Sequence, residues 1–315
     1  MASQRCHKKP RTLFANDDEH SLNGQTSHSQ PRGRNATALA VANPIASLDT
    51  RISFEEAEHA YFIDGVYFDG PSVTGLVSQF FAGDKFNGPL IIERYLSRWR
   101  EDPEHKYHDV VKGLNDDEAT TAILKTWEAT STLGTLLHKV VEMKLNNESY
   151  EVPEDVTKES QQFEKFMEDY PSLKPFRTEL SMFYSCVGQE VVACGQADAI
   201  FYCVKSQETW IVDFKRTDKN LEPDAHDFDK PGLGPMSGMP GNDFNKYSLQ
   251  QSVYALMAAQ HGIKVDKCFL LQMHPRLESY RLHECADFRQ EARKILNTFI
   301  ISVEPMADEE SYEAN

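Results

Sequence analysis

Hydrophobic and polar positions divide the chain into a helical first half and a strand-rich second half. Apolar residues recur at helical spacing in three segments, which are 89–99, 116–146 and 161–170. Ahead of them, short alternating stretches turn at Asp64-Gly65, and Ser72 or Thr74 then begins a helix. The first half therefore predicts a few short strands followed by a layer of helices.

β-Branched and aromatic residues in near two-residue alternation dominate from residue 178 onward. This pattern predicts strands at 178–187, 190–204, 209–217, 267–275 and 278–285. A helix at 247–262 separates the third strand from the fourth, and 287–303 is the last helix. The order of helices, three strands, a helix, two strands and a helix predicts an α/β fold with a mixed β-sheet flanked by helices.

Three stretches differ from this pattern and set the expected boundaries. Residues 1–48 are rich in Ser, Asn, Gln, His and Arg, so we expect a disordered arm. Residues 218–246 are polar with Pro-Gly runs, and we interpret them as an inserted loop that is either disordered or beside the site. An acidic tail follows at 304–315, so the predicted folded domain is 49–303.

Charge and cysteine content limit the class of protein. The 315 residues carry a net charge of −16, which disfavours binding of nucleic acid through bulk charge but suits carboxylates around a divalent cation. No apolar run approaches the length of a membrane span, and we expect no secretory signal. The six cysteines form no CxxC pair, which predicts reduced thiols in an intracellular protein of the nucleus, cytoplasm or mitochondrion.

The stretch "TWIVDFKRT", from Thr209 to Thr217, carries an acid and a base near the centre of a predicted strand. Residues two apart in a strand share a face, so Asp213 and Lys215 project together. If the preceding strand pairs with this one through residues 204 and 209, Asp213 faces Ile200, and Asp198 is its diagonal neighbour. Two carboxylates and an ammonium group thus converge.

Two carboxylates this close predict a cation between them, because like charges repel strongly in a low dielectric. Mg²⁺ or Mn²⁺ fits, since both prefer oxygen ligands and are held by one or two carboxylates together with substrate phosphate. Lys215 would then activate the attacking water or stabilise the charge that develops on phosphorus. A buried Asp213–Lys215 ion pair, with Asp198 capping a turn, explains the same residues equally well.

Two helical pairs and one acid extend the candidate site. His138 and Glu142 lie four residues apart on one helical face, and so do Gln250 and Tyr254 on the helix that follows the candidate strand. Glu179, on the first of the sequential strands, would face the same cluster. A histidine among apolar neighbours is also explained as a satisfied core residue.

The order of these motifs resembles the RecB-like branch of the PD-(D/E)XK nucleases. The motifs are G-x-x-x-H (Gly134–His138), an acid (Glu179), G-x-x-D (Gly195–Asp198), D-x-K (Asp213–Lys215) and Q-x-x-x-Y (Gln250–Tyr254). The lead-in "HAYFIDGVYFDGPSVTGLV" is similar to that of phage-type and mitochondrial-genome-maintenance-type exonucleases. The resemblance covers about residues 51 to 300 and implies a restriction-endonuclease-like core behind an N-terminal helical layer.

The resemblance implies a metal site. His138, Asp198 and Asp213 would be the metal ligands, and the backbone carbonyl of Phe214 would complete the set. Many relatives carry Glu where this chain has Asp213, and the shorter side chain would shift the metal. The cysteine quartet that holds an iron–sulfur cluster in some relatives is missing from the sequence, so we expect no such cluster.

The remaining matched residues have implied roles around the scissile phosphate. Lys215 would be the catalytic lysine, and Glu179 a supporting acid. Gln250 and Tyr254 would hold the lysine and the DNA backbone. Glu142 fits less well, because a solvated or ion-paired helix residue explains it at least as simply.

The implied activity is that of a metal-dependent deoxyribonuclease, an exonuclease or end-processing enzyme of DNA repair or recombination. The expected cofactor is Mg²⁺ or Mn²⁺, and the expected substrate is DNA that is single-stranded or has processed ends. The alternative is a catalytically silent nuclease fold used for DNA binding or recruitment, but we expect such a site to have lost Asp198, Asp213 or Lys215. A third interpretation is an unrelated α/β protein with chance motifs.

Overall fold

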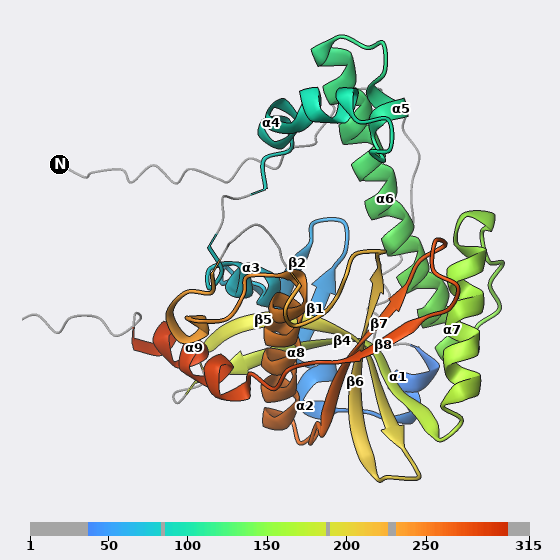
Figure 1. Ribbon diagram of the computed structural model, residues 1–315. Coiled ribbons are helices and arrows are strands. Elements are labelled where there is room, and N and C mark those ends of the chain that lie inside the picture. Colours follow the sequence, from blue (N-terminus) through green and yellow to red (C-terminus); the bar gives the residue numbers. More distant parts are fainter. Residues whose placement is uncertain (1–36, 83–85, 187–189, 226–230, 302–315) are drawn as a thin grey trace, which may run out of the picture. The chain divides into compact units, whose positions relative to one another are not determined.

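The computed structural model describes residues 37–82, 86–186, 190–225 and 231–301. Within these ranges the protein is an α/β structure with a mixed five-stranded β-sheet flanked by helices and a three-stranded antiparallel sheet (Figure 1). The predicted fold class is therefore confirmed. The predicted acidic tail at 304–315 and the first 36 residues of the predicted arm lie outside the described residues.

The elements before the large sheet are mostly helical. They are α1 (Ala38–Ala42), α2 (Ala46–Asp49), β1 (Ile52–Glu55), β2 (Ala60–Ile63), β3 (Val66–Tyr67), α3 (Val73–Ser78), α4 (Gly88–Glu101), α5 (His108–Val111), α6 (Asp116–Leu145), a 3₁₀ turn (Glu154–Val156) and α7 (Thr157–Asp169). The strands β1–β3 turn at Asp64 and Gly65, whose φ angles of 51° and 80° match the tight hairpin that the sequence predicts. Ser72 caps α3, and its side chain accepts a hydrogen bond from the Gly75 amide, also as predicted.

The large sheet and its covering helices occupy the rest of the chain. The elements are β4 (Leu173–Ser185), β5 (Val191–Cys203), β6 (Glu208–Arg216), a 3₁₀ turn (Gly234–Met236), α8 (Asp243–Gln260), β7 (Lys267–Met273), β8 (Arg281–Glu284) and α9 (Arg289–Ile301). The strand order is β4-β5-β6-β7-β8. Only β6 and β7 are parallel neighbours, and α8 provides the long crossover that a parallel pair requires.

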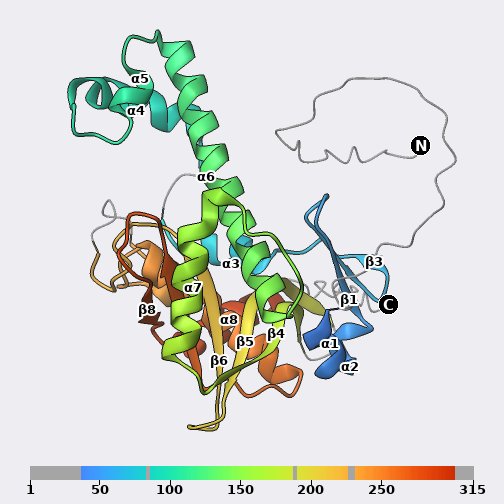
Figure 2. The ribbon, with the colours of Figure 1, turned by 90° about the vertical axis from the view of Figure 1, so that its right-hand side faces the viewer.

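Two apolar cores lie on the two faces of the large sheet. Helices α6 and α7 cover one face, and α3, α8 and α9 cover the other (Figures 1 and 2). Along β6, Ile211 belongs to the core under α8, whereas Val212 and Phe214 belong to the core under α6 and α7. Because side chains alternate along a strand, Asp213 and Lys215 project toward α8.

The register of β5 with β6 differs from the predicted one by two residues. Ile200 pairs with Ile211 rather than with Asp213. The last pair before the turn is Cys203 with Glu208, so the loop occupies 204–207 and begins one residue earlier than expected. Gln207, with a φ of 59°, closes this loop in the left-handed region. Continued by one pair, the observed register would bring Asp213 directly opposite Asp198.

The predicted disordered arm is wrong in its last part, because residues 38–49 form α1 and α2. Ile45 and Leu48 are 9% and 1% exposed and join the core under α8. The Leu39 amide donates a hydrogen bond of 3.0 Å to Oδ1 of Asn146, at the end of α6. Burial of these apolar side chains decides the structure of this segment, in contrast to the polar residues that precede it in the sequence.

The predicted inserted loop is shorter than expected and is packed in part. Helix α8 already begins at Asp243, because the Asn242 side chain caps it by accepting a hydrogen bond from the Asn245 amide. Leu221 and Met236 are 1% and 0% exposed, so both flanks of the loop reach the core. Residues 226–230 lie outside the described residues.

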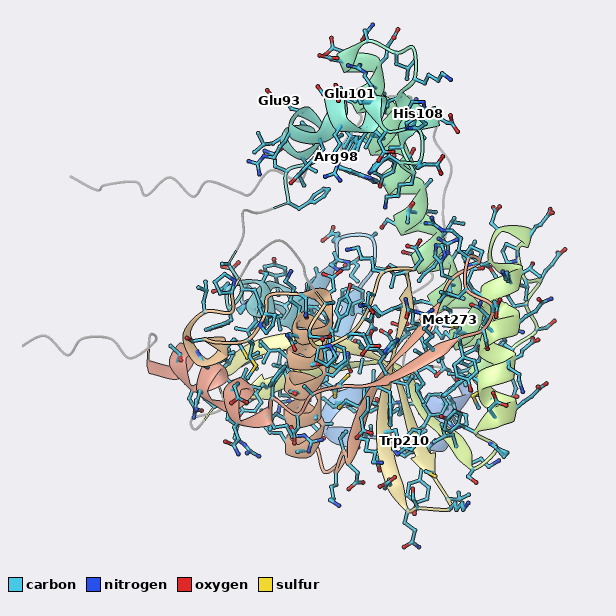
Figure 3. The ribbon with its side chains drawn as sticks, viewed as in Figure 1. Glu93, Arg98, Glu101, His108, Trp210 and Met273 are labelled. Atoms are coloured by element: carbon cyan, nitrogen blue, oxygen red, sulfur yellow. The ribbon has the colours of Figure 1, made fainter. Side chains whose placement is uncertain are left out.

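Helices α4 and α5 pack with the N-terminal half of α6 around a small core of their own. Its buried residues are Ile92, Leu96, Trp99, Val111, Ala119 and Ile123. Arg98 of α4 and His108 of α5 lie in this group of helices, whereas Trp210 and Met273 lie in strands of the large sheet (Figure 3). The predicted helical layer over the sheet is therefore supplied by α6 and α7, and α6 connects the two regions. In the part of the chain that the structure describes, no helix is long and apolar enough to cross a bilayer.

Candidate metal site

A pocket of about 720 Å³ lies between β4, β5, α6, α8 and the β1–β2 hairpin. Six of the residues that the sequence singles out line it: His138, Glu142, Glu179, Asp198, Gln250 and Tyr254. Asp213 and Lys215 are not among the residues that line this pocket, and they contact Gln251 and Tyr247 of α8. The structure thus gathers most of the predicted site on one concave surface.

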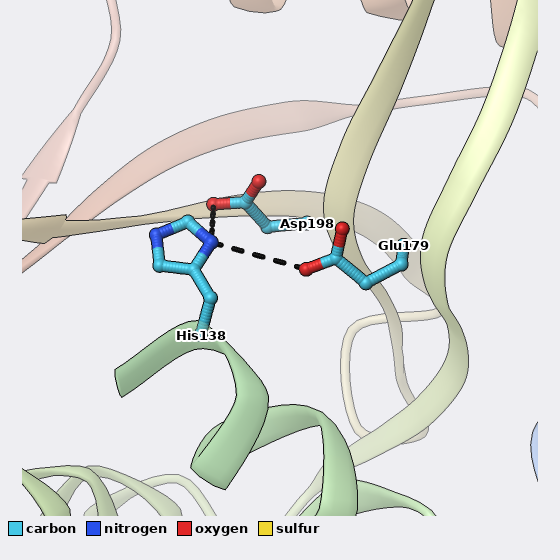
Figure 4. Close-up of side chains that lie close together, drawn as sticks. All are labelled: His138, Glu179 and Asp198. Carbon is cyan, nitrogen blue, oxygen red and sulfur yellow. Dashed lines mark ion pairs between the residues drawn. The ribbon is translucent and has the colours of Figure 1, made fainter. Parts of the chain in front are cut away.

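His138, Glu179 and Asp198 converge in this pocket. Each offers one ligand atom, and the three atoms lie within 4.8 Å of one another. Nδ1 of His138 is 3.6 Å from Oδ2 of Asp198 and 3.8 Å from Oε1 of Glu179. Figure 4 shows the imidazole reaching from α6 toward the two carboxylates on β4 and β5. One nitrogen and two carboxylate oxygens can hold a divalent cation.

The orientation of His138 is fixed from the other side of its ring. Nε2 lies 2.9 Å from the backbone carbonyl of Phe214 and donates a hydrogen bond to it, which leaves Nδ1 facing the two carboxylates. Burial alone would lower the pKa of His138, but Asp198 and Glu179 outweigh it and raise the pKa to about 9. At neutral pH the imidazolium therefore balances the two carboxylates.

Asp198 lies where β5 and β6 separate. The regular pairing of the two strands ends at Ala199 and Val212. Beyond that pair, the Phe214 amide donates a hydrogen bond of 2.7 Å to Oδ2 of Asp198. Burial raises the pKa of Asp198, and the nearby Glu179 carboxylate adds to the effect. The carboxylate therefore has a structural contact on β6 as well as a face turned toward His138.

Glu179 occupies a strained position within β4. Its φ of 46° is in the left-handed region, which is costly for a residue with a side chain. Gln196 on β5 stabilises the distortion, because its Nε2 donates a hydrogen bond of 2.9 Å to the carbonyl of Glu179. The local break in the strand lets the Glu179 carboxylate face His138.

We expect the strain at Glu179 to be measurable as a reversed preference between glycine and alanine. In an ordinary strand, Ala is more stabilising than Gly. At a φ of 46°, Glu179→Gly should be more stable than Glu179→Ala by about 1 kcal/mol, because only glycine adopts this conformation without a Cβ clash. Urea unfolding of the two variants gives the comparison directly, since both lack the carboxylate. A more stable alanine variant would show that the position is unstrained.

Asp213 and Lys215 form a buried ion pair. Oδ2 of Asp213 lies 2.6 Å from Nζ of Lys215, and the Asp213 side chain is 4% exposed. Burial raises the pKa of Asp213 to about 6 despite the attraction of Lys215. Burial works against the Lys215 ammonium, but Asp213 and Asp198 outweigh it and raise the pKa of the lysine. Lys215 is therefore a cation at neutral pH.

The predicted ligand set of His138, Asp198, Asp213 and the Phe214 carbonyl is only partly brought together. Asp213 is turned toward α8, where Gln251 donates a hydrogen bond to its Oδ1, while its Oδ2 forms the ion pair with Lys215. The Phe214 carbonyl accepts the hydrogen bond from His138. Glu179, expected only as a supporting acid, joins His138 and Asp198 instead.

Gln250 and Tyr254 lie at the pocket, but they contact each other rather than the lysine. Nε2 of Gln250 donates hydrogen bonds to Oγ1 of Thr74 at 3.2 Å and to the Tyr254 hydroxyl at 3.3 Å. Gly195 lets Tyr254 approach β5 closely, because a Cβ there would lie 2.7 Å from Cε1 of that ring. Glu142 pairs with Lys139 at 3.0 Å, as the simpler interpretation of this residue predicts.

Three polar residues at the site were missed by the sequence reasoning. They are Gln196, Tyr247 and Gln251. Tyr247 and Gln251 lie four residues apart, so they share one face of α8, and Gln251 is 0% exposed. A glutamine on the predicted buried face of a helix that follows a strand with Asp and Lys could have indicated a polar partner for those residues. Nothing in the local sequence marks Gln196.

Comparisons with known proteins do not identify a family. No protein-family model matches the chain, and no curated protein matches it. Among solved structures, that of SSO0001 is similar over 76% of this chain and 80% of its own, with 16% sequence identity and a TM-score of 0.32. A likeness at this level carries no functional argument.

Proposed function

We propose that this protein is a metal-dependent deoxyribonuclease that hydrolyses phosphodiester bonds. The observation that carries the proposal is the convergence of His138, Glu179 and Asp198 in a pocket, beside the buried pair of Asp213 and Lys215. An imidazole and carboxylates can hold a divalent cation, and an ammonium group can stabilise the charge that develops in phosphoryl transfer. Their arrangement in the order of the RecB-like nuclease motifs adds support.

The donor set suits a divalent cation held by His138, Glu179 and Asp198. The two carboxylate side chains are only 12% and 13% exposed, and a divalent cation would balance both charges once His138 releases its proton to become a ligand. Two carboxylates favour Mg²⁺ or Mn²⁺, and the imidazole favours the softer of the two, Mn²⁺. When bound, such an ion would polarise a phosphate oxygen and lower the pKa of a bound water.

Lys215 would act as a hydrogen-bond donor and a positive charge, not as a general base. Its pKa is raised by Asp213 and Asp198, which outweigh burial, so it stays protonated at neutral pH. During hydrolysis the water gives up a proton to solvent as its oxygen bonds to phosphorus, the bond to the leaving sugar oxygen breaks and that oxygen takes up a proton from solvent, and negative charge gathers on the phosphoryl oxygens. An ammonium group directed at those oxygens stabilises this charge.

The lining of the pocket favours single-stranded DNA or frayed ends. Phe54, His59 and Tyr61 of the β1–β2 hairpin contribute rings to it. The centroid of Phe54 is 5.1 Å from that of His59 and 4.7 Å from that of Tyr61. Clustered rings offer faces on which unpaired bases stack. A net charge of −16 restricts DNA binding to such local contacts.

We also propose that the protein acts inside the cell. The five cysteines that the structure describes are free thiols. Unpaired cysteines are typical of reducing compartments.

Incubation with end-labelled DNA tests the proposed function. We expect the purified protein to degrade single-stranded DNA faster than blunt duplex, faster with Mn²⁺ than with Mg²⁺, and not at all with EDTA, because the ligand set binds the ion that activates water. Gel analysis of the labelled products measures the rates. If neither ion supports cleavage of any DNA, the protein is not this nuclease, and a DNA-binding measurement would then test the silent alternative.

A further inference from the structure

Gln251, on α8, forms a hydrogen bond with Asp213, the acid of the D-x-K motif. It lies in the middle of α8, is 0% exposed, and its Nε2 donates a hydrogen bond of 2.8 Å to Oδ1 of Asp213. With Oδ1 occupied, the other oxygen, Oδ2, is directed to Nζ of Lys215 at 2.6 Å. A single side chain on α8 therefore sets the rotation of the Asp213 carboxylate.

The side-chain oxygen of Gln251, Oε1, is in a position that is unfavourable for stability. Among the residues that the structure describes, its Oε1 is buried and has no hydrogen-bond partner. A buried amide oxygen without a partner destabilises a fold. Local costs of this kind are typical of functional positions. The hydrogen bond that this side-chain amide forms is the one from Nε2 to Asp213.

Tyr247 holds the base of the same motif. It precedes Gln251 by one helical turn, and Nζ of Lys215 lies 4.4 Å from the centroid of its ring. A cation over an aromatic face is attracted by the ring, and more strongly when both are shielded from water. The ammonium is therefore bounded by Asp213 on one side and by the Tyr247 ring on the other.

We propose that Gln251 and Tyr247 are positioning residues for the hydrolytic reaction, Gln251 acting through Asp213 and Tyr247 through Lys215. The inference rests on the proposed nuclease function. Both residues lie on one face of α8, so this helix contacts the acid and the base on β6 together and fixes their positions relative to each other. Neither belongs to the Q-x-x-x-Y pair, Gln250 and Tyr254, that the sequence pointed to.

The test compares cleavage kinetics of the full-length protein with single-stranded DNA and Mn²⁺. Gln251→Met keeps the volume of the side chain but cannot donate to Asp213, and Gln251→Asn keeps the amide but is one methylene too short. Tyr247→Leu removes the ring, and Tyr247→Phe keeps it. Gln260→Met is the matched control, because Gln260 lies on α8 too and exchanges two hydrogen bonds with the Ser185 backbone far from the pocket.

We expect Gln251→Met and Gln251→Asn to lower kcat by about 10- to 100-fold, because a displaced Asp213 no longer holds the Lys215 ammonium in position. Tyr247→Leu should lower kcat by about 10-fold, and Tyr247→Phe should stay near the wild type. KM for DNA should change by less than about 2-fold in all of them, because neither residue contacts substrate. Gln260→Met should lower the melting temperature without changing kcat.

The outcomes separate the two proposals. If the wild type cleaves DNA and the Gln251 variants keep its kcat, or if Tyr247→Phe loses as much as Tyr247→Leu, the positioning role is wrong and the nuclease proposal stands. If losses in kcat follow the melting temperature across all variants, Gln260→Met included, the effect is only structural. If the wild type cleaves nothing, both proposals fail together.

Discussion

Replacing Lys215 with methionine is expected to slow DNA hydrolysis by about 10³-fold while leaving DNA bound. The ammonium lies on β6 next to Asp213, and its raised pKa keeps it charged at neutral pH. Methionine has a similar length but no charge, so the charge that develops on the phosphoryl oxygens is no longer balanced. Single-turnover cleavage of end-labelled DNA with Mn²⁺ measures the loss, and a gel-shift titration measures binding.

The control must separate lost catalysis from lost folding. Removing the ammonium leaves Asp213 buried without its ionic partner, which costs about 3–5 kcal/mol for a typical buried pair. The double variant Asp213→Asn/Lys215→Met removes both charges, so it should recover much of this stability but no activity. Lys219→Met is a matched control, because Lys219 follows the same strand, is 65% exposed and pairs with Asp243. Equal cleavage rates for the wild type and Lys215→Met would refute the proposed mechanism.

Much of the fold could be predicted from the alternation of side chains along the strands. Ile211 and Val212 face opposite cores, as their alternation in the sequence requires. The predicted pairing of β5 with β6 was two residues out of register, because the pairing depends on the turn at 204–207, where Gln207 adopts a positive φ. Gln is not a residue that signals the left-handed region, so no pattern in the sequence marks that end of the turn.

The error in the N-terminal arm has a different cause. Residues 38–49 are mostly apolar, but the prediction grouped them with the polar tract before them, whose composition favours disorder. Ile45 and Leu48 nevertheless find a place in the core under α8, and Arg177 forms an ion pair of 2.7 Å with Asp49. Tertiary contacts of this kind connect segments more than a hundred residues apart, and local composition carries no information about them.

In the candidate site, too, some features could be predicted from the sequence and others depend on tertiary packing. The resemblance to RecB-like nucleases implied that His138 and Asp198 are metal ligands and that Glu179 is a supporting acid, and the structure brings these three side chains together. The partners of Asp213 and Lys215 depend instead on how α8 is rotated against the sheet. That rotation directs Gln251 and Tyr247 to β6, while Gln250 points to the pocket. Adjacent residues of a helix point about 100° apart, so the rotation of α8 decides whether Gln250 or Gln251 contacts Asp213.

Asp198 is the residue that joins the pocket to the sheet, so its charge and its hydrogen bond can be tested separately. Oδ2 accepts the Phe214 amide at 2.7 Å where β5 and β6 diverge. An asparagine side-chain oxygen can accept the same hydrogen bond, so Asp198→Asn should keep this junction. What it removes is one of the two negative charges that face His138.

The stability of Asp198→Asn follows from the direction of the pKa shift. Burial raises the pKa of Asp198 in the folded protein, so the folded state binds this proton more tightly than the unfolded chain does. Stability is then lost as the pH rises from the unfolded pKa through the raised folded pKa. At pH 7, which lies above the unfolded pKa, burial of Asp198 therefore costs the metal-free fold stability. We expect metal-free Asp198→Asn to melt no lower than the wild type.

Asp198→Asn is expected to weaken Mn²⁺ binding by more than about 100-fold and to abolish measurable cleavage, because a neutral amide replaces a charged ligand. Calorimetric titration with Mn²⁺ measures the affinity without relying on activity. Asp266→Asn is the matched control, since Asp266 also accepts a β6 amide, that of Thr209 at 2.9 Å, but lies outside the pocket. Wild-type Mn²⁺ affinity in Asp198→Asn would mean that the ion, if bound, is held elsewhere.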